Sequence, residues 1–174
     1  MSKNKHKPSV SVVMPVYNSA KYLPLAIESI LNQTYSNFEF IIIDDGSTDA
    51  SWDIISRYSL QDKRIKAKRN PSNLGICRTL NQGLFLAGGD YIARMDSDDW
   101  SYPDRLSKQL TFTREHPQVV ICGGNIEVCD SHLKVKNHRY YPVSDKKIRE
   151  KILRINPFAH PAVVIRAEAF HKTG

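Results

Sequence analysis

The sequence FEFIII, residues 38–43, most constrains the fold of this chain because it is almost uninterrupted in apolar character. A strand of a parallel sheet is covered on both faces and therefore shows a continuous apolar run rather than an alternating one. A polar turn, DDGSTD at residues 44–49, follows the run, and a helical pattern with Trp52, Ile55 and Tyr58 on one face comes next. A strand followed by a helix is the unit of an α/β fold, so we predict that fold class.

The same unit recurs along the chain as far as residue 116. Further strands are predicted at residues 9–14, 65–68, 91–93 and 119–122, and helices at 19–32, 76–87 and from 101 onward. Pro15 is expected to end the first strand, and Ser19 to cap the first helix. The alternation predicts a mostly parallel, Rossmann-like sheet flanked by helices, with right-handed crossovers.

The last third of the chain departs from this alternation. A strand pair is predicted at residues 127–135 and 138–141, a basic amphipathic helix at 145–153, a strand at 161–165 and the start of a helix at 167–170.

Composition and charge narrow the class of protein. The 174 residues, 41% hydrophobic and 25% charged, are typical of one soluble globular domain. The net charge of +7 is compatible with a polyanionic partner, but the positive residues are spread over several segments without interleaved aromatics. We therefore expect no nucleic-acid partner.

The cysteines and the N-terminal segment indicate in which cellular compartment the protein is expected. Cys77, Cys122 and Cys129 are odd in number and match no zinc spacing, so we expect reduced thiols in a cytoplasmic protein. No signal peptide opens the chain, and no apolar run approaches the roughly 20 residues of a membrane span. Residues 1–8 are expected to be a disordered basic tail that at most contacts an anionic membrane peripherally.

Three polar loops follow predicted strands, at residues 15–18, 44–49 and 96–100. In parallel sheets these loops share the edge at which ligands bind. Asp96, Asp98 and Asp99 would repel one another there, and a divalent cation with a diphosphate co-ligand would relieve that repulsion. The alternative is a solvated acidic turn, but two acid-rich loops at one edge favour a site.

The residues around this edge suggest a nucleotide ligand. There is neither a Walker A loop nor a G-x-G-x-x-G after the first strand, so a metal would have to bear most of the phosphate charge. Arg69 and Arg78 are the nearest candidates to help, or else solvated surface residues. Asp45 can accept a hydrogen bond from a ribose hydroxyl or a base N–H, and Tyr17 can stack on a base or pack against the first helix.

Two further assignments at this edge are structural. Asp49 is expected to cap the helix that follows it, and residues 70–75 to form a turn.

The segments PVYN (15–18), DDGSTD (44–49) and DSDD-x-x-x-P (96–103), in this order and spacing, resemble those of the family 2 inverting glycosyltransferases. That resemblance implies the GT-A fold of nucleotide-diphospho-sugar transferases. It implies transfer of a sugar, most often from a UDP-sugar with Mn²⁺ or Mg²⁺, to an acceptor hydroxyl with inversion. Bacterial relatives act in surface glycan synthesis, so a glycan or lipid-linked acceptor is expected.

The resemblance also assigns roles to residues. The loop containing Pro15, Tyr17 and Asn18 would line the nucleotide pocket, and Asp45 would contact the base. Asp96 and Asp98 would bind the ribose and the metal–diphosphate, with Asp98 the direct metal ligand.

One part of the family pattern is missing from the sequence. The family carries a later acidic residue, often in a Glu-Asp pair, that deprotonates the acceptor, and no such pair occurs here. We therefore expect residues 9–174 to be a glycosyltransferase domain truncated at its C-terminal end, with the base beyond Gly174. His160 would border the acceptor site, unless it is a structural histidine in a proline-flanked turn.

Two other functions remain open from the sequence. A nucleotide-sugar-binding module without catalysis would need no base. A haloacid-dehalogenase-like phosphatase would use Asp96 as nucleophile, but that family carries Thr or Val where Asp99 stands and places the motif on its first strand.

Overall fold

A computed structural model describes residues 8–173, with the backbone alone for residues 171–173. The predicted basic tail lies outside the described residues, apart from Pro8. The elements in chain order are β1 (Val10–Val16), α1 (Leu23–Leu31), β2 (Phe38–Asp44), α2 (Ser51–Gln61), β3 (Ile65–Arg69), α3 (Ile76–Leu86), β4 (Tyr91–Arg94), α4 (Arg105–Glu115), β5 (Ile121–Cys122), β6 (Ile126–Cys129), β7 (Val135–Arg139), α5 (Asp145–Ile152), the 3₁₀ helix η1 (His160–Ala162), β8 (Val164–Arg166) and α6 (Glu168–Thr173).

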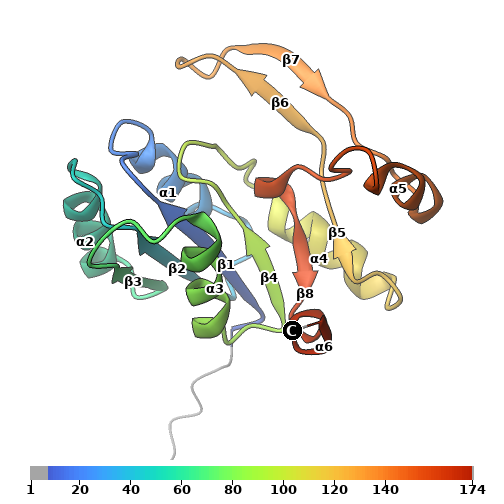
Figure 1. The fold of residues 1–174 in the computed structure, drawn as a ribbon, viewed down its shortest axis with the longest axis horizontal. Coiled ribbons are helices and arrows are strands. Elements are labelled where there is room, and N and C mark those ends of the chain that lie inside the picture. Colours follow the sequence, from blue (N-terminus) through green and yellow to red (C-terminus); the bar gives the residue numbers. More distant parts are fainter. Residues whose placement is uncertain (1–7, 174) are drawn as a thin grey trace, which may run out of the picture.

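The described strands form a six-stranded sheet and a separate hairpin (Figure 1). The sheet has the order β3-β2-β1-β4-β8-β5, and the hairpin joins β6 to β7. The first four strands are parallel, whereas β8 runs antiparallel to both β4 and β5. The predicted mostly parallel α/β sheet is therefore confirmed.

Helices cover both faces of the sheet, as the apolar run of β2 requires. Its side chains alternate between the two sides: Phe40 and Ile42 join a cluster with residues of α1, α2 and α4, while Ile41 and Ile43 join a cluster against α3 and α6. Phe40 is fully buried. Burial of side chains of this size contributes about 1.5–3 kcal/mol each, so β2 is a principal anchor of the core.

Two predictions in the first unit are wrong. The first strand does not stop at Pro15: β1 pairs with β2 as far as Val16, and a proline is tolerated because pairing with β4 has already ended at Val13. Helix α1 begins at Leu23 rather than at residue 19, with Tyr22 in the N-cap position. The intervening residues form a turn in which the Ser19 carbonyl accepts the N–H of Tyr22 at 3.0 Å.

Predictions in the last third are correct in kind but not in their bounds. The hairpin turn spans residues 130–134, because the Asp130 carboxylate accepts the N–H groups of His132 and Lys134 at 3.0 and 3.1 Å. Residues 160–162 form η1, with proline in its first turn, so the strand predicted at 161–165 begins only at Val164. Strand β5 is limited to residues 121–122 rather than 119–122.

The three cysteines are unpaired, as predicted. Within residues 8–173, every helix is too short or too polar to cross a bilayer.

A buried carboxylate, Glu39, ties three strands together at the end of the sheet opposite the acidic loops. It is 4% exposed, accepts the Ser11 hydroxyl at 2.5 Å and the Gly88 N–H at 2.7 Å, and pairs with Lys66 of β3. Burial alone would raise the pKa of Glu39, but the hydrogen bonds from Lys66, Ser11 and Gly88 outweigh it and lower the pKa.

This depressed pKa makes part of the folding stability dependent on pH. The unfolded chain, with an ordinary Glu pKa of about 4.3, takes up the proton first as the pH falls, so stability present above about pH 5 is lost on acidification. Urea denaturation at pH 7, 5, 4 and 3.5 should show this loss, and Glu39→Gln should show less of it than the wild type. Glu115→Gln, at an exposed position of α4, is the matched control and should retain the full acid loss. Equal acid loss in wild type and Glu39→Gln would contradict the assignment.

Candidate functional site

Four loops meet at the carboxyl ends of the parallel strands, following β1, β2, β3 and β4. The sheet order places β1 between β2 and β4, so the loop after β1 lies between the two acidic loops. Hydrogen bonds between side chains and backbone connect the loops to one another, as the next paragraphs describe. The three loops predicted from sequence therefore do share one edge, and a fourth, residues 70–75, joins them.

Asn18 links the loop after β1 to the turn after β2. Its side-chain oxygen accepts the N–H of Thr48 at 2.9 Å, and its own N–H donates to the Ser47 hydroxyl at 3.0 Å. It adopts φ 49°, a left-handed conformation for which asparagine is favoured among non-glycine residues. This residue, predicted to line the nucleotide pocket, thus has a structural task in the ligand-free protein.

Asp49 strengthens the same connection. Its carboxylate accepts the N–H of Ser51, the first residue of α2, and the N–H of Ala20, both at 3.0 Å. It therefore binds the first turn of α2 as capping predicts, although Ala50 occupies the N-cap position. Burial opposes the ionised form of Asp49, but these hydrogen bonds prevail and lower its pKa.

Asp45 organises the loop after β3. Its carboxylate is 4% exposed and accepts the Asn70 side-chain amide at 2.8 Å and the N–H groups of Leu74 and Gly75 at 2.9 Å. Burial would raise its pKa, but hydrogen bonds from these groups and from Thr79 lower it. Because protein donors already occupy both oxygens, Asp45 holds the wall of the site, and contact with a base stays a prediction.

Arg69 also serves the architecture of the turn. Its guanidinium lies 3.1 Å from the Asp44 carboxylate and donates to the Ser47 carbonyl at 2.8 Å. Asp44 is fully buried, so the pair neutralises a charge that would otherwise be costly there. Arg69 thus holds the turn together while its side chain stays 44% exposed to solvent.

The segment after β4 exposes its carboxylates in different degrees. Ser97 is 7% exposed and lies with its hydroxyl 2.7 Å from that of Ser19, which joins this segment to the loop after β1. Asp96 is half-buried, accepts a hydrogen bond from Arg94 Nε at 3.1 Å and forms an ion pair with a terminal nitrogen of Arg94, also at 3.1 Å. Asp98 is exposed and has no recorded hydrogen bond or ion pair within residues 8–173.

The pKa of Asp99 reflects the excess of negative charge in this segment. Although the residue as a whole is exposed, desolvation of its carboxylate, together with the charges of Asp96 and Asp98, raises its pKa to about 6. The nearby Arg105 and Arg94 oppose this effect. An additional cation would relieve the repulsion.

Arg105, at the start of α4, holds the backbone that leads into the acidic segment. It donates to the carbonyl of Pro161 and, at 3.2 Å, to the carbonyl of Arg94. Burial lowers its pKa to about 10, while Asp99 works in the opposite direction. Arg105 therefore remains a cation at neutral pH and connects the end of β4 to η1.

The donor set fits a divalent cation only in part. Asp96 and Asp98 offer carboxylate oxygens, the ligands that Mg²⁺ and similar ions prefer. Among the described residues, however, no three His, Cys, Asp or Glu side chains are grouped closely enough to hold a metal. The segment thus fits a cation that brings further oxygen ligands, such as those of a diphosphate.

The remaining predicted residues surround this edge. Tyr17 is 47% exposed, so its ring is not packed into the core against α1. Pro15 is half-buried within β1, and Arg78 is exposed in the first turn of α3. His160 is exposed and lies in η1, hydrogen-bonded to the side chain of Asn156.

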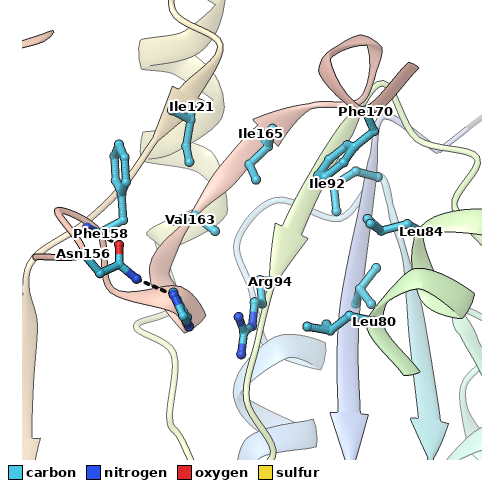
Figure 2. A pocket seen from close by; sticks show the side chains of 12 residues that line it. Leu80, Leu84, Ile92, Arg94, Ile121, Asn156, Phe158, Val163, Ile165 and Phe170 are labelled. Carbon is cyan, nitrogen blue, oxygen red and sulfur yellow. Dashed lines mark hydrogen bonds between the residues drawn. The ribbon is translucent and has the colours of Figure 1, made fainter. Parts of the chain in front are cut away.

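An apolar cavity of about 320 Å³ lies between α3 and β8 and is bordered by Arg94 at the end of β4 (Figure 2). Leu80 and Leu84 of α3 line one wall, and Val163 and Ile165 line the opposite wall. Arg94, Asn156 and His160 supply its polar lining. The structure thus brings His160 and Arg94, the ion-pair partner of Asp96, to one cavity, although no sequence pattern connects these residues.

The sequence interpretation missed several residues of this edge: Ser19, Ser47, Asn70, Arg94, Ser97 and Arg105. Asn70 could have been predicted, because it is a polar residue that directly follows a strand and therefore lies at the binding edge. Arg94 stands two residues before Asp96 at the end of a strand, a position from which it can reach that carboxylate.

Sequence comparison decides the family. The profile of Glycosyl transferase family 2 matches residues 11–174. The chain belongs to glycosyltransferase family 2. The resemblance noted in the sequence is thereby confirmed, and the phosphatase alternative is set aside.

Relatives of this family 2 chain are longer than the chain itself. An uncharacterized glycosyltransferase of Haemophilus influenzae is 41% identical over 162 residues, which are 93% of this chain and 64% of the relative. The putative glycosyltransferase EpsE of Bacillus subtilis is 40% identical over 165 residues, 94% of this chain and 58% of EpsE. The putative colanic acid biosynthesis glycosyl transferase WcaA of Escherichia coli is 38% identical over 131 residues, 74% of this chain and 46% of WcaA.

Solved structures confirm the GT-A fold. Mannosyltransferase PcManGT from Pyrobaculum calidifontis, in complex with GDP-Man and Mn²⁺, superposes with a TM-score of 0.71 at 20% identity, covering 98% of this family 2 chain and 48% of that protein. Residues 1–349 of S. aureus TarS, in complex with UDP-GlcNAc, give a TM-score of 0.70 at 24% identity, covering 94% of this chain and 47% of that TarS fragment.

Proposed function

We propose that this domain binds a nucleotide-sugar, most favourably a UDP-sugar, together with Mn²⁺ or Mg²⁺, and transfers the sugar to an acceptor hydroxyl with inversion. We further propose a glycan or lipid-linked acceptor in bacterial surface glycan synthesis, in the cytoplasm and with at most peripheral membrane contact. EpsE and WcaA, whose names assign them to glycosyl transfer and, for WcaA, to colanic acid biosynthesis, support this class.

The observation that carries the proposal is the connected edge of the sheet. Four loops with polar and acidic residues are held together by hydrogen bonds, with exposed Asp98 and half-buried Asp96 beside exposed Tyr17. A diphosphate with its cation would neutralise the acidic segment, and the exposed ring would provide a stacking surface for a base.

Each residue then has a defined task. Tyr17 packs on the base, and Arg78 approaches the diphosphate from the first turn of α3. Asp96 and Asp98 would hold the cation, which when bound stabilises negative charge on the departing nucleoside diphosphate. His160 borders the acceptor side of the cavity.

The catalytic base is proposed to lie beyond Gly174, as the sequence predicts. The competing proposal, a binding module without catalysis, would share every donor-site residue. Glycosyl transfer by a longer form of the protein, absent when a downstream carboxylate is replaced, would separate the two.

Thermal unfolding with and without ligand tests the donor site. UDP with Mn²⁺ should raise the melting temperature more than GDP, CDP or ADP with Mn²⁺, and more than UDP alone. At a ligand concentration 100 times Kd, the expected stabilisation is about 3 kcal/mol.

The variant Asp98→Ala should remove the metal-dependent part of this stabilisation while leaving the ligand-free melting temperature close to that of the wild type. Asp53→Ala, at an exposed position of α2, is the matched control and should respond to UDP and Mn²⁺ like the wild type. The proposal fails if no nucleoside diphosphate shifts the unfolding transition.

A further inference from the structure

The ion pair between Arg94 and Asp96 occupies one of the two carboxylates proposed to hold the cation. Arg94 Nε and a terminal nitrogen both lie 3.1 Å from the same oxygen of Asp96. The side chains of Arg94 and Asp96 are only 19% and 27% exposed, so solvent screens the pair incompletely. A positive charge therefore already stands where a metal would have to bind.

The backbone fixes Arg94 in this position. Its N–H donates to the Val163 carbonyl at 3.1 Å, and its carbonyl accepts from Arg105 at 3.2 Å. Both bonds use main-chain atoms of Arg94, so they survive replacement of the Arg94 side chain. The guanidinium can thus exchange partners while the end of β4 stays in place.

We propose that Arg94 is a positioning residue that makes metal binding conditional on the diphosphate. Without a nucleotide, a divalent cation that binds Asp96 must share the carboxylate with the guanidinium or displace it, and in either case it lies beside a positive charge. A diphosphate offers the displaced guanidinium a new anionic partner and supplies the cation with the oxygens that the protein lacks. This inference rests on the proposed donor site.

The surroundings of Arg94 are consistent with this exchange. The side chain lines the cavity beside α3, together with Asn156 and His160 (Figure 2). Asp98, two residues beyond Asp96, has no recorded cationic partner among the described residues, so Arg94 acts on only one of the two proposed ligands.

Mn²⁺ binding measured by electron paramagnetic resonance, without and with saturating UDP, tests the proposal without any measurement of activity. Arg94→Met should bind Mn²⁺ alone at least fivefold more tightly than the wild type, because Asp96 is freed. The gain in Mn²⁺ affinity that UDP produces should become smaller in the same variant. A purely structural role would lower affinity rather than raise it.

Two controls separate competition at Asp96 from loss of charge in general. Arg94→Lys keeps the cation and should bind Mn²⁺ alone like the wild type. Arg57→Met removes one charge at an exposed position of α2 and should also behave like the wild type. Should Arg94→Met not fold, Arg94→Gln provides the same comparison.

The inference is overturned if the neutral Arg94 variant binds Mn²⁺ alone no more tightly than the wild type, or if Arg57→Met shows an equal gain. The proposed function has a separate criterion, since it fails if neither UDP nor any other nucleoside diphosphate produces a gain in Mn²⁺ affinity in the wild type. The measurement with Mn²⁺ alone still shows in that case whether Arg94 competes for Asp96.

Discussion

Asp45→Ala should destabilise the ligand-free protein by about 3–5 kcal/mol, since it removes the charged acceptor of three hydrogen bonds that fix the loop after β3. The donors of these bonds are the Asn70 amide and the N–H groups of Leu74 and Gly75, at 2.8–2.9 Å from the carboxylate. A loss of this size is a large part of the total stability of a typical domain. Chemical denaturation followed by circular dichroism measures it.

Asp45→Asn provides a graded version of the same experiment. An asparagine can keep its oxygen toward Asn70 and Leu74, but it turns an NH₂ group toward the N–H of Gly75. The stability of the Asp45→Asn variant should therefore lie between that of the wild type and that of Asp45→Ala. Asp98→Ala is the matched control, because it removes an exposed carboxylate of the same edge and should change the stability by less than about 0.5 kcal/mol. Equal stabilities of Asp45→Ala and Asp98→Ala would show that Asp45 serves a ligand and not the loops.

Gly46→Ala should cost about 3–5 kcal/mol and displace the loop after β3. Gly46 has φ +71°, and an added Cβ would lie 2.5 Å from the Ser72 carbonyl carbon and 2.9 Å from the Asn73 nitrogen. Backbone strain of about 1–3 kcal/mol and overpacking of about 1–3 kcal/mol both contribute. Denaturation gives the stability, and titration with UDP and Mn²⁺ should show weaker binding because the wall of the site has moved.

Gly75→Ala is the control that separates these two contributions. Gly75 also has a positive φ, +87°, but an added Cβ would meet no atom within 4 Å. Its alanine variant should show the strain alone and therefore be the more stable of the two. Equal losses would mean that the close approach of residue 46 to Ser72 contributes nothing.

The layout of the sheet could be predicted because it depends on local patterns. The continuous apolar run of β2 and the helical pattern of α2 each reflect which faces are buried, so their type and order were correct. The bounds that failed depend on neighbours in space. Pro15 is accommodated by the early end of pairing with β4, and the hairpin turn is set by the carboxylate of Asp130.

The sequence predicted which loops form the candidate site, but not which residues in those loops bind one another. That residues 15–18, 44–49 and 96–100 share an edge follows from the parallel sheet. That Asn18 and Asp45 bind neighbouring loops, and that Arg94 pairs with Asp96, depends on distances between segments that the sequence does not encode locally. Which carboxylates are free for a ligand became apparent only once these partners were located.

The position of β8 in the sheet has a consequence for how the chain is made on the ribosome. Strand β8 lies between β4 and β5, and β5 has no other partner in the described sheet. The ribosome synthesises β4 and β5 first, then the hairpin and α5, and β8 only afterwards. Until residues 164–166 emerge, the edges of β4 and β5 that later pair with β8 therefore remain unpaired. Unpaired edges favour intermolecular association, and this interval is therefore when the nascent chain most needs protection from its neighbours.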